Sequence, residues 1–358
     1  MLPEIEVPAN ASRFFDSFET ALAQPTGTIE ITYDCVEHYY YNSKFDSSLI
    51  FQDSNYYTKD SFQLTNSINI FNPPVKKYDL LNIIDIGCGQ GEYVKILTKL
   101  GNSAMGYDPV LKESTSNLKS ESFHPEMIGD KSEKTFIMRC VLPHIENPFL
   151  YIDSIFLHSP KSKIYIEFQR LEWILINKAW TSICHDHISL FTIENFVGRY
   201  NIIESGVFAR GEWGFVLFCK KEKNNLMVAH KGDNTSDKHL NAFKSIFEIR
   251  NQQLNALIKY DKPILIYGGA AKGTIFSHAF KSNGGRELFC IDSDSGRQGK
   301  YLELSGVEVI SPQTALSDFD LDTLILVMNK NHVESVNKIF DNSSRIISLN
   351  NFSIGFGS

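Results

Sequence analysis

Short apolar runs that end in glycine or in a polar residue recur along the chain from residue 80 onward. LLNIIDIG (80–87) is almost continuously apolar, a pattern typical of a parallel strand that is buried on both faces. GEYVKILTKLG (91–101) follows with helical spacing of its apolar residues and predicts a helix that ends near its last glycine. The same patterns predict further strands at 103–108, 135–142 and 163–168, helices at 147–157 and after Leu190, and a hairpin or edge strand at 208–221. Strands and helices that alternate in this way favour a doubly wound α/β sheet.

A second α/β unit is predicted after a polar segment. Residues 221–238 have the composition of a linker, and residues 237–260 place apolar side chains on one stripe, as an amphipathic helix does. The first 75 residues have no long period and are rich in tyrosine, so we expect a cap or arm that lies on another part of the molecule. We therefore predict four parts, namely an N-terminal arm or cap (1–75), a first α/β domain (76–222), a linker with an amphipathic helix (223–260) and a second Rossmann-like α/β domain (261–358).

Composition and charge narrow the class of protein. The chain has 358 residues, of which 42% are hydrophobic and 22% are charged, and this ordinary globular composition excludes a disordered protein. Its net charge of -7 argues against a surface that binds nucleic acid. No apolar run is long enough to span a bilayer, the N-terminus lacks the pattern of a signal peptide, and the six cysteines include no CxxC pair. We therefore expect a cytoplasmic monomer or homodimer with reduced thiols that neither binds nucleic acid nor inserts into a membrane.

A glycine-rich loop between the first strand and its helix is the strongest local signal for a ligand. The sequence DIGCGQG (85–91) places glycines where a backbone must turn sharply and approach a ligand closely, next to the free N–H groups of a helix. Asp108 lies 21 residues after Gly87, at the end of the next predicted strand, where its carboxylate can accept both hydroxyl groups of a ribose. The predicted cofactor-binding residues are Asp85, Gly87, Cys88, Gly89, Gly91, Asp108 and Pro109.

The spacing of these glycines distinguishes between cofactors. A dinucleotide fingerprint needs its third glycine at position 92, which is Glu92 here. The form D-x-G-x-G-x-G instead resembles motif I of the class I S-adenosylmethionine (SAM) methyltransferases. That resemblance implies a Rossmann-like methyltransferase sheet with SAM as the cofactor. The alternative interpretation is a purely structural turn between strand and helix, which needs glycines for its conformation and binds no cofactor.

Several further motifs resemble one methyltransferase family. VLPHIENP (141–148) is similar to the VLEHIxxP motif, IEFQ (166–169) to a strand that ends in IEVP, and ICHDHISLF (183–191) to I-Y-H-E-H-x-S-Y-F. YYYNS (39–43) is similar to an N-terminal YxYxSS element, and the second α/β unit follows the C-terminal motifs of the same family. From about residue 36 to 350 the chain thus resembles the SAM-dependent sugar C-methyltransferases. The resemblance implies a nucleotide-activated ketosugar as the small-molecule substrate.

This chain departs from that family in three ways. The family usually begins with a zinc-binding module made of CxxC pairs, which is absent here, so we expect no structural zinc. Cys184 stands where the family has tyrosine, and Asp186 stands where it has glutamate. These two changes can alter the chemistry of the pocket. The alternatives to methyl transfer to carbon are therefore methyl transfer to oxygen or nitrogen, and a family member that binds its ligands without catalysis.

Methyl transfer to carbon requires a base that removes a proton next to a carbonyl group and a donor that stabilises the enolate oxygen. The family match predicts His187 as the base, with Asp186 orienting it, and His144 or His185 as the donor. Tyr39 or Tyr41 would bind substrate or assist the proton transfer if the cap folds over the pocket. The alternative roles are packing for the tyrosines and structural support for His185. An H-x-H metal pair at 185 and 187 has no visible third ligand, so we predict no metal.

The second α/β unit carries a glycine loop of its own. Gly268 and Gly269 follow a predicted strand, Lys272 follows at the start of a helix, and Asp292 ends the next strand. Lys272 and this loop either support the diphosphate of a nucleotide sugar or pack between the domains. The predicted substrate-binding residues are Glu167, Cys184, Gly269 and Lys272.

Overall fold

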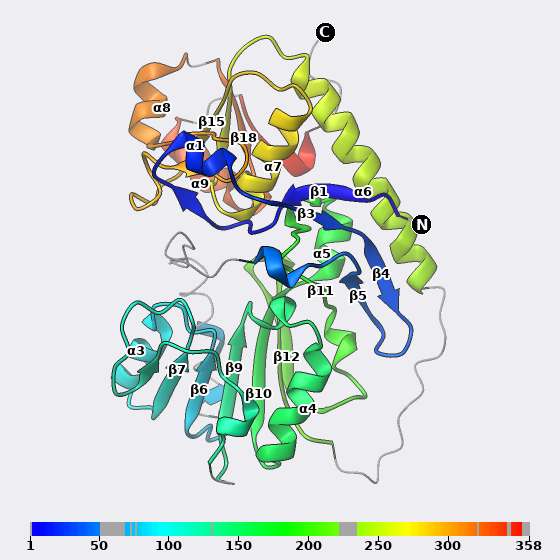
Figure 1. Cartoon of the computed structure of the whole chain (residues 1–358), viewed down its shortest axis with the longest axis vertical. Helices are drawn as coiled ribbons and strands as arrows, with labels where there is room; N and C mark the ends of the chain where they lie inside the picture. The colour runs from blue at the N-terminus through cyan, green and yellow to red at the C-terminus, as the bar shows by residue number, and fades with distance from the viewer. Residues whose placement is uncertain are drawn as a thin grey trace.

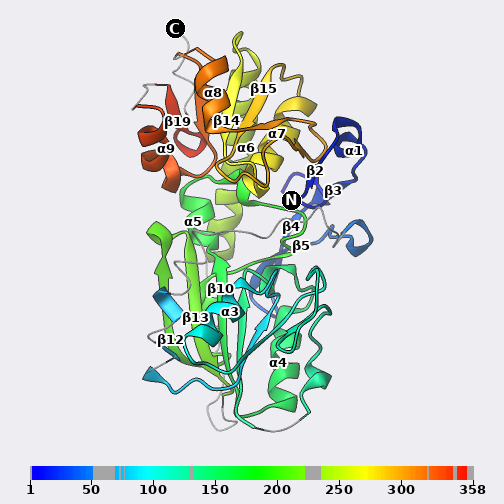
Figure 2. The same ribbon diagram turned by 90° about the vertical axis from the view of Figure 1, so that its left-hand side faces the viewer.

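The computed structural model describes residues 2–50, 69–71, 74–75, 77–129, 132–221, 235–320, 322–341 and 345–352. Two α/β units lie at opposite ends of the long axis of the molecule, and the N-terminal segment lies between them (Figure 1). Helix α5 (Leu171–Ile176) lies at the junction of the units, as the view turned by 90° also shows (Figure 2). Most of the predicted linker, residues 222–234, falls outside the described residues.

The first unit is a seven-stranded mixed sheet with the order β12-β13-β10-β9-β6-β7-β8. The strands β10, β9, β6, β7 and β8 are parallel, and β13 pairs antiparallel with both β10 and β12. Their bounds are β6 (Ile83–Ile86), β7 (Ala104–Tyr107), β8 (Leu118–Lys119), β9 (Thr135–Arg139), β10 (Lys163–Gln169), β12 (Asn201–Phe208) and β13 (Trp213–Cys219). The predicted α/β architecture is therefore correct for this unit.

Both faces of this sheet are buried, which explains the continuous apolar runs in its sequence. Ile86 and its neighbours on one face pack against α4 (Pro148–His158), and Ile83 and its neighbours on the other face pack against α3 (Glu92–Lys99). The strands and helices predicted between residues 80 and 168 all contain an observed element of the predicted type.

The helix predicted after Leu190 is wrong. Only one short 3-10 turn, Ile193–Asn195, forms there, and the chain then enters strand β12. Pairing with β13 along the whole length of β12 supplies a ladder of main-chain hydrogen bonds, and this tertiary pairing overrides the local spacing. The hairpin predicted at 208–221 is present, but its first strand lies mainly before residue 208.

The second unit is a parallel five-stranded sheet with the order β17-β15-β14-β18-β19. Its strands are β14 (Ile264–Tyr267), β15 (Leu288–Ile291), β17 (Val309–Ile310), β18 (Leu324–Val327) and β19 (Ile346–Ser348). Helices α6 (Thr235–Ile258) and α7 (Ala271–Ser282) cover one face, and α8 (Pro312–Asp318) and α9 (Val333–Ile339) cover the other. The amphipathic helix predicted at 237–260 is therefore α6, which packs through Phe243 and Leu254.

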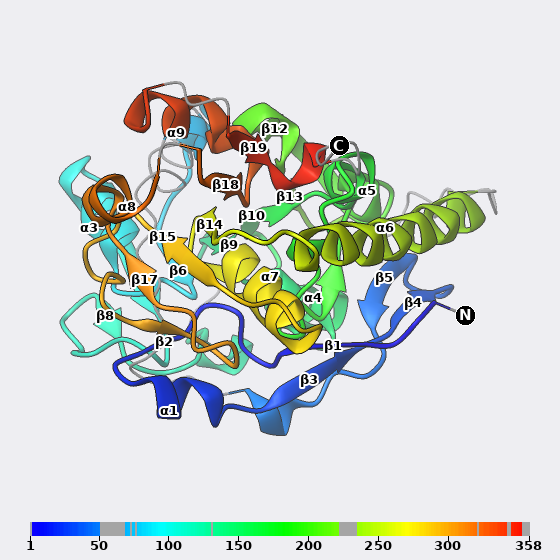
Figure 3. The ribbon, with the colours of Figure 1, turned by 90° about the horizontal axis from the view of Figure 1, so that it is seen from above.

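The N-terminal segment pairs with strands of both units. Strand β1 (Ile5–Pro8) pairs with β3 (Thr26–Ile29) and runs alongside α7, as Figure 3 shows from above. Strand β2 (Phe14–Phe15) pairs with β16 (Tyr301–Leu302) of the second unit, and the short helix α1 (Phe18–Leu22) follows it. Strand β5 (Tyr39–Asn42) lies between β4 (Ile31–Asp34) and β11 (Ser189–Leu190) of the first unit. The segment thus joins the two units through main-chain pairing.

Among the described residues, no helix combines the length and the hydropathy that a membrane crossing requires.

Candidate functional site

The first glycine loop connects β6 to α3 and has the backbone that its sequence predicts. Gly87, Gly89 and Gly91 all have positive φ angles, of 70°, 57° and 74°. A Cβ atom at Gly87 would lie 2.3 Å from Cγ2 of Val141, and one at Gly91 would lie 2.6 Å from the side chain of Leu118. Since side chains are excluded here by both conformation and space, the main chain of the loop can approach a ligand closely, while the N–H groups of the three glycines donate to acceptors within the chain.

Asp108 lies against this loop, as predicted. Its Oδ2 accepts a hydrogen bond from the N–H of Gly89 at 2.7 Å, and its Oδ1 accepts one from the N–H of Val110 at 2.9 Å. Burial raises the pKa of Asp108, while these two bonds oppose the rise. Each oxygen keeps a second lone pair, which can accept a ribose hydroxyl. Pro109, the next residue, is exposed.

Cys88 points inward beneath the loop. Its side chain is buried, and a Cβ atom at Gly106 of the neighbouring strand would lie 2.7 Å from its Sγ. Burial raises the pKa of the thiol well above its usual range, and the carboxyl groups of Asp85 and Asp108 add to this effect. Cys88 therefore supports the loop by packing, and its main chain is the part that faces a ligand.

A cluster of charged side chains lies under the loop. Asp85 is fully buried, and neither of its carboxyl oxygens has a hydrogen-bond partner among the described residues. Burial raises the pKa of Asp85 to about 7, against the opposing effect of Arg139. The guanidinium of Arg139 lies 4.2 Å from the ring centre of Tyr93, and Glu167 accepts a 2.8 Å bond from the hydroxyl of Tyr165. Glu167 thus belongs to a buried cluster and does not line the described cavities.

Sequence reasoning missed Arg139. The signal was available, because a cation at the end of the apolar strand TFIMR needs a buried anion, and Asp85 and Glu167 lie on the two adjacent strands.

A second centre forms where the loop after β9 meets the segment before β11. The imidazole rings of His144 and His187 meet edge to face, with their centres 4.7 Å apart. His144 donates a 2.6 Å hydrogen bond from Nδ1 to the main-chain carbonyl of Asp186. Burial, together with the nearby His144, lowers the pKa of His187 to about 4, and the carboxylate of Asp186 opposes the change. The ring of His187 is therefore neutral near pH 7.

His187 lines a cavity of about 10 Å³. This volume has room for about one water molecule. The other lining residues are Cys140, Pro143, Gln169, Ile174, Ser189, Leu190 and Trp213. Cys140 has a positive φ of 60°, a conformation that side-chain-bearing residues adopt mainly where the surrounding structure enforces it. Gln169 and Trp213, which sequence reasoning did not single out, follow from the pairing of β10 with β13 at this end of the sheet.

The structure separates His185 from this centre. Its Nδ1 donates to the carbonyl of Ala9, and its Nε2 accepts from the N–H of Asp46, each at 3.3 Å. The ring is fully buried against Phe45, and a Cβ atom at Gly27 would lie 2.4 Å from it. Both nitrogens of His185 are thus occupied by the N-terminal segment. Residues 183–188 form no strand, so the two histidines do not share a face.

The tyrosines of β5 lie beside the same segment. Tyr41 is the strand partner of Ser189, and Tyr40 is the partner of Leu190. Tyr39 stacks on Phe191, with ring centres 5.8 Å apart, and its own ring lies 6.0 Å from that of Tyr41. Burial raises the pKa of Tyr39. The ring contacts of Tyr39 are those of a core residue, while Tyr41 is only partly buried.

Cys184 lies close to the carboxylate and the imidazole that follow it in the sequence. Its side chain is 3% exposed, and the donor atoms of Cys184, Asp186 and His187 all lie within 4.8 Å of one another. Burial raises the pKa of its thiol well above the usual range.

The second glycine loop repeats the arrangement of the first. The N–H of Gly269 donates to Oδ2 of Asp292 at 2.9 Å, as Gly89 does to Asp108. Here, however, Arg297 also pairs with that oxygen at 3.0 Å, and its guanidinium lies over the ring of Phe14. The carboxylate of the second unit is therefore already engaged by a cation of its own chain.

Lys272 bridges the two units. Its Nζ forms a 2.5 Å ion pair with Oε1 of Glu212 and lies 4.8 Å from the ring centre of Trp173. Glu212 also accepts hydrogen bonds from three amide side chains, those of Gln169, Asn329 and Asn331. Burial alone would raise the pKa of Glu212, but Lys272 and the amides lower it overall. These contacts favour the packing role for Lys272, and Glu212 was not predicted because its partners lie far away in the sequence.

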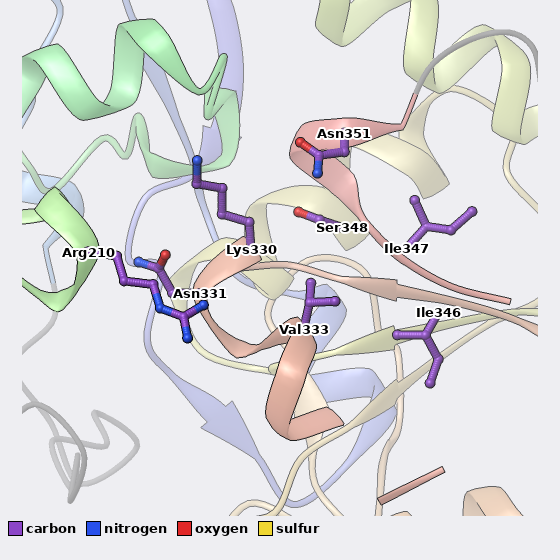
Figure 4. A pocket seen from close by; sticks show the side chains of 8 residues that line it. All are labelled: Arg210, Lys330, Asn331, Val333, Ile346, Ile347, Ser348 and Asn351. Carbon is purple, nitrogen blue, oxygen red and sulfur yellow. The ribbon is translucent and has the colours of Figure 1, made fainter. Parts of the chain in front are cut away.

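A larger cavity of about 460 Å³ opens next to this bridge. Arg210 of the first unit and Lys330 and Asn331 of the second line one side of it, as Figure 4 shows. Arg210 pairs with Glu334 at 2.8 Å, and Lys330 donates to Oδ1 of Asn177. Both cations thus have partners within the chain.

Comparison with known proteins agrees with the geometry of the first unit. Residues 66–199 match a family described as a methyltransferase domain, and this range includes the glycine loop, Asp108 and the His144–His187 centre. No curated protein matches the chain.

Several solved structures resemble part of the chain. Magnesium protoporphyrin IX methyltransferase from Synechocystis PCC 6803 is 13% identical over 46% of this chain and 90% of its own, with a TM-score of 0.35. The glycopeptide N-methyltransferase MtfA is 10% identical over 46% of this chain and 96% of its own, with a TM-score of 0.33. PH0226 protein from Pyrococcus horikoshii OT3 is 13% identical over 45% of this chain and 93% of its own, with a TM-score of 0.34. The family match and the geometry of the loop together identify a SAM-dependent methyltransferase domain in the first unit of this chain.

Proposed function

We propose that this protein transfers a methyl group from SAM to a carbon atom of a nucleotide-activated ketosugar, with His187 as the base. The observation that carries this proposal is the meeting of three segments that are distant in the sequence. Strand β5 with Tyr41, the turn with His144 and the segment with His187 all converge near the cavity that His187 lines. These are the segments whose sequences resemble the sugar C-methyltransferases.

The glycine loop fits SAM in two respects. Its glycines adopt positive φ angles that let the main chain turn sharply toward a ligand, and the carboxylate of Asp108 lies where it can accept hydroxyl groups. The carboxyl of Asp85 lies buried under the same loop. When bound, SAM supplies an electrophilic methyl group. The residues that would hold it are Gly87, Gly89 and Gly91 through their main chains, together with Asp85 and Asp108.

The neutral ring of His187 can accept a proton from a carbon atom. Because its low pKa makes it a weak base, the C–H bond must be acidified by a neighbouring carbonyl group, and a ketosugar provides one. Of the two predicted donors to the enolate oxygen, His185 has both ring nitrogens occupied, which leaves His144. The Nδ1 proton of His144 is committed to Asp186, so donation to the substrate requires a proton on Nε2.

Methyl transfer to oxygen or nitrogen is the second candidate. Cys184 and Asp186, which replace the tyrosine and glutamate of the resembling family, favour it because they change the groups that surround the reacting atoms. Such a reaction needs no loss of a proton from carbon. The second candidate therefore differs from the first in what happens to that proton.

The test is to incubate the protein with SAM and a panel of nucleotide-linked ketosugars in D₂O and to analyse the sugars by mass spectrometry. The proposal expects one sugar to gain a methyl group and to exchange the hydrogen next to its carbonyl when SAM is left out. A methylated product without exchange at carbon would identify the second candidate. His187→Gln should abolish the exchange while SAM still raises the melting temperature.

A further inference from the structure

We propose that Cys184, Asp186 and His187 form a binding site for one divalent transition-metal ion of the zinc class. Three different donor types converge here, a thiol, a carboxylate and an imidazole, with all donor atoms within 4.8 Å of one another. Among the described residues, this is the one such group of three histidine, cysteine or acidic side chains that the fold brings together. The site lies in the first unit, immediately before β11.

The spacing of the donors suits a tetrahedral ion. Bonds of about 2.0 Å to nitrogen or oxygen and about 2.3 Å to sulfur place neighbouring donors roughly 3.3–3.8 Å apart. A separation of up to 4.8 Å therefore closes onto an ion by side-chain movements of about 1 Å. Rotation about the side-chain bonds of these three residues can supply movements of this size.

The carboxylate of Asp186 is an independent indication of a cation. The side chain is 7% exposed, and its Oδ1 has no hydrogen-bond partner among the described residues. An isolated buried carboxylate oxygen costs folding free energy unless a donor or a cation satisfies it. A metal ion held between Cys184 and His187 would provide that cation.

The surroundings leave a fourth position open. His187 lines the cavity of about 10 Å³, which has room for a single water molecule, and the polar side chains of Gln169 and Ser189 also line it. Three protein ligands with one water or substrate position is the arrangement of catalytic zinc sites, whereas structural sites are closed by four protein ligands. Of the three proposed ligands, His187 is the one that lines this cavity, so a water there would lie next to its ring.

His144 supports the site from outside. Its hydrogen bond to the carbonyl of Asp186 fixes the main chain between two of the ligands, and its ring packs against that of His187. Such contacts commonly orient metal ligands. The donor types also select the ion, because thiolate and imidazole favour zinc, cobalt or iron over magnesium or calcium. On binding, the thiol of Cys184 releases its proton to solvent and a sulfur–metal bond forms, with no change of oxidation state.

An ion at this site has a consequence that rests on the proposed function. A ring nitrogen of His187 that coordinates a metal cannot also accept a proton from substrate. The metal-bound form would therefore be inactive if His187 is the base, and the ion would act as a reversible inhibitor. Binding of the ion does not itself depend on the identity of the substrate.

The test uses Co²⁺ as a spectroscopic probe of the full chain, followed by Zn²⁺ competition. We expect one Co²⁺ per chain, with an intense near-ultraviolet charge-transfer band from the thiolate. Cys184→Ser should remove this band, and Asp186→Asn should weaken binding at least roughly tenfold. Cys35→Ser, which changes an exposed cysteine, is the matched control and should leave the band intact. The absence of a band in the native chain, or its persistence in Cys184→Ser with an unchanged melting temperature, would overturn the site.

Turnover with and without Zn²⁺ separates this inference from the proposed function. Inhibition that a chelator reverses is expected if both are correct. Metal binding without any inhibition would leave the site in place but contradict the role of His187 as the base and the inhibitory consequence. Turnover that no metal affects, in a chain that gives no cobalt band, would remove the metal site and leave the proposed function standing.

Discussion

His144 donates a 2.6 Å hydrogen bond from Nδ1 to the main-chain carbonyl of Asp186, across 42 residues of sequence. This bond joins the turn after β9 to the segment before β11 and fixes the tautomer of the ring, because a carbonyl oxygen can only accept. It also leaves Nε2 as the one ring nitrogen of His144 that can exchange a hydrogen bond or a proton with a ligand. The same contact thus positions the main chain and selects the chemistry of the ring.

His144→Asn should separate these two roles. An asparagine side chain can keep a donor near the position of Nδ1 but has nothing at Nε2. We expect near-native thermal stability and a fall in kcat of roughly 100-fold or more, which is the usual contribution of a lost acid–base group. His144→Ala should lose both stability and activity. Native turnover by His144→Asn, with SAM binding checked in parallel, would show that Nε2 has no role.

Gly87→Ala should abolish tight binding of SAM. The new Cβ atom would lie 2.3 Å from Val141, and the positive φ of 70° adds roughly 1–2 kcal/mol of strain. Gly101→Ala is the matched control, because Gly101 has a φ of 87° but nothing within 4 Å of its Cβ position. Calorimetric titration with SAM should show at least a roughly tenfold loss for the first variant and native affinity for the second. Equal affinities would mean that the loop tolerates the extra atom.

Asp85 should make the SAM-free protein less stable as the pH rises from about 4 to 7. Its pKa is about 7 in the folded state, against an ordinary value of 3.8, so the folded state keeps a proton that the unfolded state releases. The stabilisation is full below pH 4 and is lost as the pH passes 7, and it amounts to roughly 4 kcal/mol.

Melting temperatures across this pH range provide the measurement. Asp85→Asn should flatten the decline and be more stable than the native chain at pH 8. Asp16→Asn changes an exposed aspartate and should leave the slope unaltered. Parallel curves for Asp85→Asn and the native chain would mean that Asp85 is ionised throughout.

Glu212→Gln should weaken the contact between the units. The change leaves Lys272 without its buried anion and turns an amide group toward donors such as Asn329, so we expect a loss of about 3 kcal/mol. The double variant Glu212→Gln with Lys272→Met should recover part of this loss, because the unpaired charge is removed. Thermal unfolding followed by tryptophan fluorescence, to which Trp173 next to Lys272 contributes, measures both. A native melting temperature for Glu212→Gln would contradict the bridge.

Local patterns were sufficient to predict the first glycine loop. The strand, the turn and the helix around residues 85–91 are adjacent in sequence, and Asp108 follows on the next strand, so their geometry depends on short-range rules. The helix predicted after Leu190 failed because strand pairing is a long-range contact that the local spacing does not contain.

The surroundings of the candidate catalytic residues were predicted only in part for the same reason. The approach of His144 to His187 is consistent with strands that end at one edge of the sheet. The different environment of His185 depends on Ala9 and Asp46, whose positions are set by the N-terminal segment. The ion pair of Lys272 and Glu212 joins the two units, and the spacing of residues along the chain does not indicate which residues pair across such a contact.

The pairing of β2 with β16 has a consequence for how the molecule is made. Residues 14–15 are synthesised long before their hydrogen-bonding partners at 301–302. Strand β2 must therefore wait, without its strand partner, until residues 301–302 have emerged from the ribosome. A nascent chain stalled before residue 301 should expose this stretch to chaperones and proteases, and synthesis of β16 should be the event that protects it.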